Sequence, residues 1–256
     1  VAELTIISRT DADDHGWRVD KHADSELKRP RPEAHPHGTT IEVRDLFAAI
    51  PVRRRFLKQP RTELLQIQQL IRRAGFCYPE ITFTLSHDGR PSLSLLSSRQ
   101  GSSAQRRWQS VFGREFVDAA TIIDVEVDGL RLEGWVGELS YSRQGADLQY
   151  LAVNRRIVRD RHIFHAARMA YGDAVPDGRY PAYALRLVLP GTAVDVNVHP
   201  GKAEVRFVDP RTVHDIVYAS VKQALVAPNN NGGQSPLQYL ESLASEPQQM
   251  VADGAQ

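Results

Sequence analysis

Apolar residues occupy every second position at 194–198 and again at 203–207. This period of two is typical of strands that are buried on one face. Between the two runs, Pro200 and Gly201 break the pattern and predict a tight turn. Lys202 follows the turn directly, so its ammonium group is expected at the tip of a rigid β element, where it can act as a point charge on a phosphate. The alternative is a solvated turn lysine.

The rest of the pattern predicts strands and helices that alternate along the chain. Residues 1–21 are expected to form two strands around a polar turn, and the polar residues 22–37, with three prolines, a loop. Further strands are predicted at 39–46, 122–127, 130–138, 148–153 and 182–189. Hairpins are predicted from the strands 81–87 and 92–96 and at 154–158. Pro51 is expected at the first position of a short basic helix, and longer helices are predicted at 62–75, 104–112, 161–171 and from Pro210 onward. The last helix is expected to be capped by Asp209 and to bury one apolar face, which consists of Val213, Ile216, Val217, Val221 and Ala224.

Mixed sheets and helices in two layers indicate the α+β class. The small, polar stretch Ser97–Gln105 is the best domain boundary, which predicts one domain over 1–98 and a second over 99–226. Residues 227–256 are poor in apolar side chains and are interpreted as a flexible linker, in which Leu237–Leu243 is either a short helix or a partner-binding segment.

Composition narrows the cellular setting. Hydrophobic residues make up 41% of the 256 residues, which is enough for sizeable cores without disulfides or metals. The single cysteine, Cys77, lies between Phe76 and Tyr78 and is expected to be a buried, inert thiol in a reducing compartment. No apolar run reaches the roughly 18–20 residues that span a bilayer. We therefore expect a cytoplasmic protein without a membrane partner.

The net charge is only +1, but basic residues are concentrated in two stretches. Residues 53–61 hold five basic side chains and no acid, and a structural role in pairing acids between layers is the preferred interpretation. Residues 155–168 contain one acid, Asp160, and five arginines, which are Arg155, Arg156, Arg159, Arg161 and Arg168. These arginines are candidates for contacting nucleic-acid phosphates without reading sequence, and a solvated helix face is the alternative.

Three stretches carry a family resemblance, in the same order as in the family. They are Gly38-Thr-Thr-Ile-Glu-Val-Arg-Asp-Leu-Phe47 followed by Pro51-Val-Arg-Arg-Arg-Phe-Leu-Lys58, Val153-Asn-Arg-Arg-Ile-Val-Arg-Asp-Arg161, and Asp195-Val-Asn-Val-His-Pro-Gly-Lys-Ala-Glu-Val-Arg-Phe207. Together they resemble the MutL family of DNA mismatch repair proteins, and the resemblance covers roughly residues 1–226.

The resemblance implies a fold and a function. It implies the C-terminal part of a GHKL-type ATPase α/β sandwich, followed by a transducer domain. The function implied is an ATP-switched, homodimeric clamp that binds double- or single-stranded DNA independently of sequence and couples mismatch recognition to downstream repair proteins. The implied setting is the bacterial cytoplasm, with nucleoid association during repair. Among the basic residues, the match best supports Arg161 as a DNA contact.

The resemblance also implies nucleotide-contacting residues, with ATP and Mg²⁺ as cofactors in the complete protein. Lys202 matches the lysine that reaches the γ-phosphate and takes part in catalysis, although the family's preceding alanine is Gly201 here. Asn197 is expected to orient that turn, or else to be an ordinary exposed strand residue. Gly38, Thr39 and Thr40 match the last nucleotide-binding motif of the site, with Thr40 favoured as a hydrogen-bonding group. Their alternative is a β-branched strand start after a turn.

Other motifs of the family are missing from this sequence. No Asp-x-Gly-x-Gly occurs, and the chain begins at Val1, inside a predicted strand. We therefore expect a fragment that does not hydrolyse ATP alone, with an exposed sheet edge, exposed apolar surface and poor solubility. A processed terminus is the alternative explanation of the first residue. The histidine pairs His162/His165 and His35/His37 lack a third ligand at fixed spacing, so no metal site is predicted.

Two other functions remain open from the sequence. One is a DNA- or partner-binding module that works without nucleotide, for which the basic residues 155–168 are the motivation. The other is the transducer of a different GHKL protein, such as a type II topoisomerase, against which the long match ending at Phe207 argues.

Overall fold

The computed structural model describes residues 2–22, 27–97, 103–195 and 205–226. The chain divides into two compact units, Val1–Ile67 and Gln68–Gln256. Each unit is described by itself. The predicted boundary at 98/99 lies inside the second unit, because residues on both sides of it pack into one core around Phe76, Leu95 and Phe112. The assignment of 1–98 and 99–226 to two family domains stays a prediction.

The first unit contains an antiparallel sheet with the strand order β3-β2-β1-β4. Its strands are β1 (Glu3–Arg9), β2 (Gly16–Lys21), β3 (Arg31–Glu33) and β4 (Gly38–Arg44). β1, β2 and β4 confirm the predicted strands. The prediction of a loop over all of 22–37 was wrong at β3, which pairs with β2 despite Pro32. β3 lies at the sheet edge, where a residue without a backbone N–H is tolerated.

One face of this sheet is apolar and open. The strand register places Ile6 opposite both Val19 and Ile41, and Leu4 opposite Val43, so these side chains share a face. Trp17, Ile41 and Val43 are 42%, 62% and 55% exposed. The sheet of the first unit therefore lacks a covering layer on its apolar face among the described residues. This confirms the expected apolar surface.

Two helices follow β4. α1 (Pro51–Arg54) starts with the proline that the sequence predicted at the first helical position. α2 (Pro60–Cys77) confirms the helix predicted at 62–75 and extends it by two residues at each end. In the second unit, Leu70 of α2 is 67% exposed, whereas Gly75, Phe76 and Cys77 are buried.

A five-stranded mixed sheet forms the centre of the second unit, with the order β11-β10-β13-β8-β7. Its strands are β7 (Ala120–Val127), β8 (Leu130–Gly137), β10 (Gln149–Val153), β11 (Arg156–Ile157) and β13 (Tyr183–Val188). All confirm predicted strands or hairpins. Gly134 of β8 has φ +148°, and a side-chain carbon there would lie 1.9 Å from the carbonyl oxygen of Ala184, so only glycine fits this close approach to β13.

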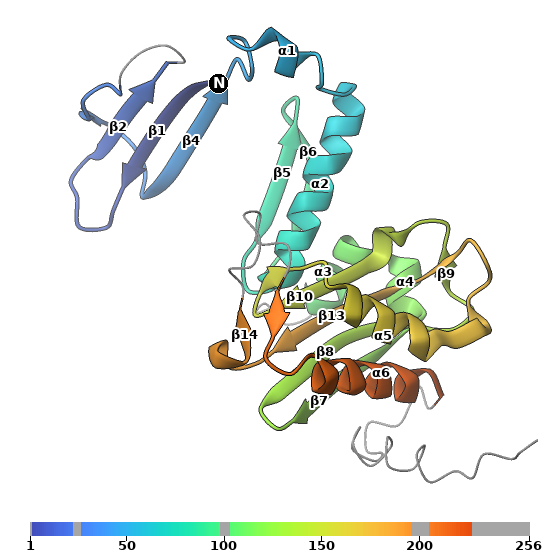
Figure 1. Cartoon of the computed structure of the whole chain (residues 1–256). Helices are drawn as coiled ribbons and strands as arrows, with labels where there is room; N and C mark the ends of the chain where they lie inside the picture. The colour runs from blue at the N-terminus through green and yellow to red at the C-terminus, as the bar shows by residue number, and fades with distance from the viewer. Residues whose placement is uncertain (1, 23–26, 98–102, 196–204, 227–256) are drawn as a thin grey trace, which may run out of the picture. The chain divides into compact units, whose positions relative to one another are not determined.

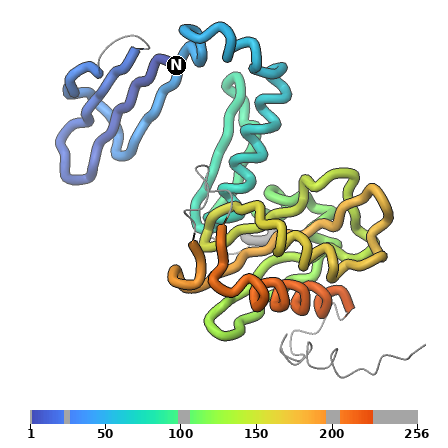
Figure 2. The backbone as a smooth tube through the Cα atoms, viewed as in Figure 1, coloured from blue at the N-terminus to red at the C-terminus, as the bar shows by residue number. Residues whose placement is uncertain are grey.

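Helices cover both faces of this sheet (Figures 1 and 2). α5 (Arg161–Tyr171) and α6 (Pro210–Val226) lie on one face, while α3 (Ser103–Phe112), α4 (Arg114–Asp118) and the end of α2 lie on the other. The alternation along β10 explains this arrangement, because Leu151 and Val153 face one core whereas Tyr150 and Ala152 face the other. α4 was not predicted, since it is one turn long and follows Gly113.

Aspartate caps fix the starts of α5 and α6. Oδ1 of Asp160 accepts hydrogen bonds from the backbone N–H groups of His162 and Ile163, each at 3.0 Å. Oδ1 of Asp209 accepts one from the N–H of Thr212 at 3.0 Å, which confirms the predicted cap. The predicted apolar face of α6 is confirmed as well, because all of its members are buried, namely Val213, Ile216, Val217, Val221 and Ala224.

Shorter elements complete the second unit. β5 (Phe83–His87) and β6 (Arg90–Leu95) form the predicted hairpin, and β9 (Ser142–Arg143) pairs with β12 (Tyr180–Pro181). β14 (Val194–Asp195) pairs with β15 (Arg206–Phe207), which confirms the outer ends of the predicted strand pair. Single turns of 3-10 helix occupy Ala146–Leu148, Gly172–Ala174 and Gly191–Ala193.

Arg107 of α3 joins the end of α2 to the β5–β6 hairpin. Its side chain is 1% exposed. Nη2 donates to the carbonyl oxygens of Gly75 and Tyr78 at 2.8 and 2.9 Å, and Nη1 donates to those of Ile81 and Leu95 at 2.9 and 3.1 Å. One guanidinium thus satisfies carbonyl groups that the end of a helix leaves unpaired.

Within the described residues, no helix combines the length and apolar character needed to cross a membrane.

Replacing Arg107 with methionine should lower the free energy of unfolding by about 3 kcal/mol, because several buried carbonyl groups lose their donor. Urea denaturation followed by circular dichroism measures this change. Arg106→Met is the matched control, since Arg106 is the exposed neighbour on the same helix. Equal stability of the two variants would contradict the role of Arg107.

Candidate nucleic-acid interface and nucleotide-contact residues

The three predicted nucleotide contacts of the first unit lie at the start of β4, on the edge of the sheet. Gly38 has φ +122°, a conformation that side chains rarely allow. The hydroxyl groups of Thr39 and Ser8 are 2.8 Å apart, and Oγ1 of Thr40 lies 2.7 Å from Nε2 of His35. Neighbouring strand residues point to opposite faces, so Thr39 and Thr40 do not face one ligand together.

Lys202 and Asn197 lie outside the described residues, so their predicted roles stay predictions. The strands on either side are described. β14 and β15 pair Val194 with Phe207 and Asp195 with Arg206 in antiparallel register. This pairing brings the two ends of residues 196–204 together.

The five predicted DNA-contacting arginines fall on three consecutive segments of the second unit. Arg155 and Arg156 belong to the β10–β11 hairpin, Arg159 precedes α5, and Arg161 and Arg168 are on α5. Asn154 fixes the hairpin to the end of β13. Its side chain donates to the carbonyl oxygen of Leu189 at 2.9 Å and accepts from the N–H of Leu189 at 3.0 Å.

The two hairpin arginines are held by the protein itself. Nη1 of Arg155 lies 2.7 Å from a carboxylate oxygen of Glu80, and its guanidinium stands over the ring of Tyr78 at 5.7 Å. Arg156 is half-buried, and its Nη1 is buried without a hydrogen-bond partner. Neither side chain is as available to DNA as the sequence pattern suggested.

The other three arginines are exposed, and they have no side-chain partner among the described residues. Arg161 and Arg168 are seven residues apart on α5, which places them two turns apart on one face of the helix. Asp160, the only acid in this stretch, is buried and uses its carboxylate to cap α5. It therefore forms a helix cap and no ion pair with Arg159 or Arg161.

A groove between α2 and the hairpin adds an arginine that the sequence analysis missed. A cavity of about 590 Å³ is lined from α2 by Leu70, Arg73, Ala74, Cys77 and Tyr78, and from the hairpin side by Asn154, Arg155, Arg156, Ile157 and Arg159. A second cavity of about 300 Å³ shares Arg73, Ile157 and Arg159 and reaches Phe164 of α5. We call the two cavities together the α2–hairpin groove.

The sequence did not single out Arg73, because the pattern of α2 indicates its apolar face and not the neighbours of its basic residues. The pair Arg72-Arg73 was visible in the sequence, but nothing there indicated which arginine faces the hairpin. The structure separates them. Arg73 lines the α2–hairpin groove, whereas Nη1 of Arg72 donates to the carbonyl oxygen of Val111 at 3.1 Å.

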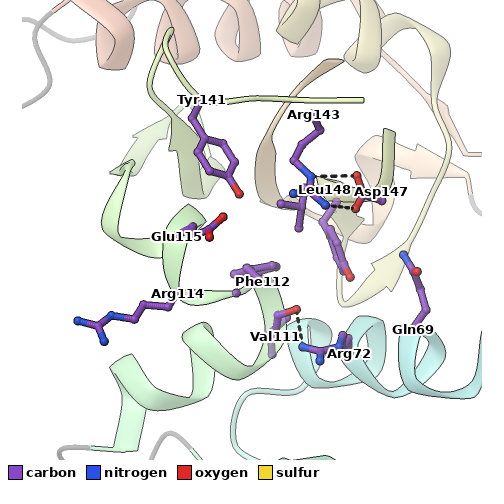
Figure 3. Close-up of a pocket in the computed structure, with 12 residues that line it drawn as sticks. Gln69, Arg72, Val111, Phe112, Arg114, Glu115, Tyr141, Arg143, Asp147 and Leu148 are labelled. Carbon is purple, nitrogen blue, oxygen red and sulfur yellow. Dashed lines mark hydrogen bonds and ion pairs between the residues drawn. The ribbon is translucent and has the colours of Figure 1, made fainter. Parts of the chain in front are cut away.

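Arg72 lines a separate pocket of about 500 Å³, which Figure 3 shows. Charged groups in this pocket are largely satisfied by the protein. Nη2 of Arg143 lies 2.7 Å from a carboxylate oxygen of Asp147, and the Arg114 side chain is paired with Asp118 at 3.2 Å. These ion pairs make the pocket a weaker candidate for phosphate binding than the exposed arginines near α5.

Cys77 lines the α2–hairpin groove but is only 3% exposed. Burial raises the pKa of its thiol to about 11, against the smaller opposing effect of the Arg186 charge. The prediction that Cys77 is buried is confirmed, and its inertness stays a prediction.

The folded chain should react slowly with a disulfide reagent at pH 8. A thiol pKa of about 11 instead of the usual 9.0 lowers the thiolate fraction, and hence the rate, by about 100-fold relative to the chain in urea. The folded thiol also keeps its proton between these two pKa values. Burial of the protonated thiol therefore contributes fully to the free energy of unfolding below pH 9. This contribution is lost as the pH rises through 11. Equally rapid labelling of folded and unfolded chains would contradict the burial of Cys77.

Sequence comparisons give one consistent family. A family model described as "DNA mismatch repair protein, C-terminal domain" matches residues 108–226. The DNA mismatch repair protein MutL of Pseudomonas putida (strain W619) is 43% identical over 258 residues, which cover 100% of this chain and 41% of the relative. MutL of Pseudomonas syringae pv. tomato is 44% identical over 239 residues, which cover 92% and 37%. The chain thus spans about two-fifths of the length of these curated relatives.

Solved structures agree with the sequence relatives. The Aquifex aeolicus MutL ATPase domain complexed with ADP aligns with a TM-score of 0.56 at 26% identity, covering 74% of this chain and 68% of that chain. The N-terminal domain of a DNA repair protein aligns with a TM-score of 0.72 at 23% identity, covering 89% and 73%, and shows the shared fold. These relatives favour mismatch repair over the topoisomerase alternative.

Proposed function

The chain belongs to the MutL family of DNA mismatch repair proteins, and we propose that it supplies the DNA-contacting and nucleotide-sensing part of an ATP-switched clamp. The complete clamp would be a homodimer that binds DNA independently of sequence. It would work with mismatch-recognition proteins and downstream repair proteins. The open apolar face of the first unit, with Ile41 and Val43, supports a role inside a larger assembly, because such faces mark contact surfaces.

The observation that carries the DNA-binding part is the row of exposed arginines beside α5. Arg159, Arg161 and Arg168 have no partner among the described residues, and the nearby acid, Asp160, is used as a helix cap. Guanidinium groups in this state can contact phosphates and release counterions without contacting bases. Arg155 and Arg156, which the protein holds in the groove wall, support this surface by adding positive charge.

Nucleotide sensing is the second part of the proposal. The described residues contain no group of three or more histidine, cysteine, aspartate or glutamate side chains that could hold a metal ion, so Mg²⁺ would be held chiefly by the triphosphate itself. Thr40 offers a hydroxyl group on the polar face of β4, and Lys202 offers an ammonium group. The bound triphosphate supplies the terminal phosphate on which a lysine charge distinguishes ATP from ADP. Lys202 and Asn197 belong to the second unit, so contact with that phosphate would couple nucleotide binding to β14 and β15.

Replacing Arg161 with glutamate should weaken duplex binding about tenfold, or about 1.4 kcal/mol, because one charge-assisted contact is lost. The slope of log affinity against log salt should fall by about 0.9. Fluorescence anisotropy over a salt series measures both quantities. The substitution should not unfold α5, since an acid is favourable in the first turn of a helix.

Arg211→Glu is the matched control for Arg161→Glu. Arg211 also lies in the first turn of a helix that starts after an aspartate cap, and its side chain is 93% exposed. This variant should bind duplex like the unchanged chain. If both variants behave alike, the proposed arginine surface is wrong.

Replacing Lys202 with alanine in a full-length protein should lower steady-state ATP turnover while leaving the fold intact, because the substitution removes a charge at a turn. A phosphate-release assay and circular dichroism on the same samples test this. Normal turnover in the folded variant would remove Lys202 from the nucleotide site.

A further inference from the structure

The α2–hairpin groove combines an apolar floor with a basic rim. Leu70, Ala74 and Ile157 provide apolar lining, and Leu70 is 67% exposed. The rim consists of arginines from both walls, namely Arg73, Arg155, Arg156 and Arg159. DNA would match the charge of the rim but would leave the leucine unused. An acidic peptide with apolar side chains would match both.

The rim has charge that the described residues do not neutralise. Glu80 pairs with Arg155, but Arg73 and Arg159 have no side-chain partner among the described residues. Nη1 of Arg156 is buried without any acceptor, which is unusual for a guanidinium nitrogen. The accessible open charges are therefore those of Arg73 and Arg159, and an occupant with carboxylates would pair with these two side chains.

The chain itself contains a segment of this chemistry. Residues 227–256 carry three acids, Glu241, Glu246 and Asp253, and no lysine or arginine. Leu237, Leu240 and Leu243 recur there at every third position, next to the two glutamates. In a helical conformation this spacing places the leucines on one side.

The segment is also within reach. α6 ends at Val226 and packs against α5, whose Phe164 lines one end of the groove. The eleven steps from Val226 to Leu237 span at most roughly 40 Å of extended chain. α6 itself, with its 17 residues, is about 25 Å long. The linker is thus long enough to run back along α6 toward α5.

We propose that residues 237–246 dock in the α2–hairpin groove of the same chain. The leucines would cover the apolar floor, and Glu241 and Glu246 would pair with Arg73 and Arg159. Docking would occupy Arg159, one of the proposed DNA contacts, so the segment would compete with DNA and salt would weaken its hold. The docking itself stands on the groove and does not depend on DNA binding.

The test places a photo-crosslinking amino acid at Leu240 of the full chain. After irradiation, mass spectrometry should find crosslinks to residues 70–78 or 154–159. The same label at Met250, outside the proposed segment, is the positional control and should not give these crosslinks. Irradiating a mixture of isotope-labelled and unlabelled chains separates contacts within one chain from contacts between two. Crosslinks mainly between chains, or mainly outside the groove, would overturn the proposal.

Charge-reversal variants test the proposed ion pairs directly. Arg73→Glu with Arg159→Glu should lower the crosslink yield about fivefold, which is the size expected for two exposed ion pairs. Adding Glu241→Arg and Glu246→Arg should restore it. Arg114→Glu, a reversal of an exposed arginine that lines the separate pocket of Figure 3, should leave the yield unchanged. Circular dichroism checks that each variant is folded.

An unchanged crosslink yield in the double variant would overturn the proposal. A yield that stays low in the variant with all four substitutions would overturn it as well. The docking and the DNA surface can fail separately. Arg161→Glu lies outside the groove lining, so it should weaken DNA binding and leave the crosslink intact. Added duplex should lower the crosslink yield in the unchanged chain, and an unchanged yield at saturating duplex would refute the competition.

Discussion

The buried guanidinium of Arg107 is the interaction on which the layout of the second unit depends. It gathers carbonyl oxygens from the end of α2 and from both sides of the β5–β6 hairpin. A carbonyl buried without a donor is costly, so this one side chain fixes where α2 ends. The end of α2 carries Arg73, Cys77 and Tyr78, which form one wall of the α2–hairpin groove. Without Arg107, that wall would lose its position relative to the sheet.

The basic surface around α5 depends on the position of one acid, Asp160. Asp160 is the only acid between Arg155 and Arg168, and its carboxylate is buried against two backbone N–H groups. The same residue therefore starts the helix and removes itself from the surface. Arg159 and Arg161, on either side of it, are exposed to solvent and form no ion pair with it. A modest net charge of +1 is thus compatible with a strongly basic surface.

Each unit exposes a surface that indicates binding to a partner. The first unit exposes an apolar sheet face, and the second exposes arginines and a groove with an apolar floor. The apolar surfaces are costly to keep in water, and each of the three surfaces fits a partner of matching chemistry. The apolar face fits another protein layer and the α5 face fits phosphates. The groove fits an acidic segment such as the one that follows α6.

The sequence by itself determined the elements and the family. The sequence pattern predicted α5 at 161–171, and the Asp209 cap with Pro210 predicted the start of α6, because these signals are local. It also singled out the five arginines, but only tertiary structure divided them into exposed and protein-held side chains. Arg73, the role of Arg107 and the edge strand β3 likewise came from the structure alone. Each depends on which distant residue lies opposite, and that is set by packing between segments that local patterns do not encode.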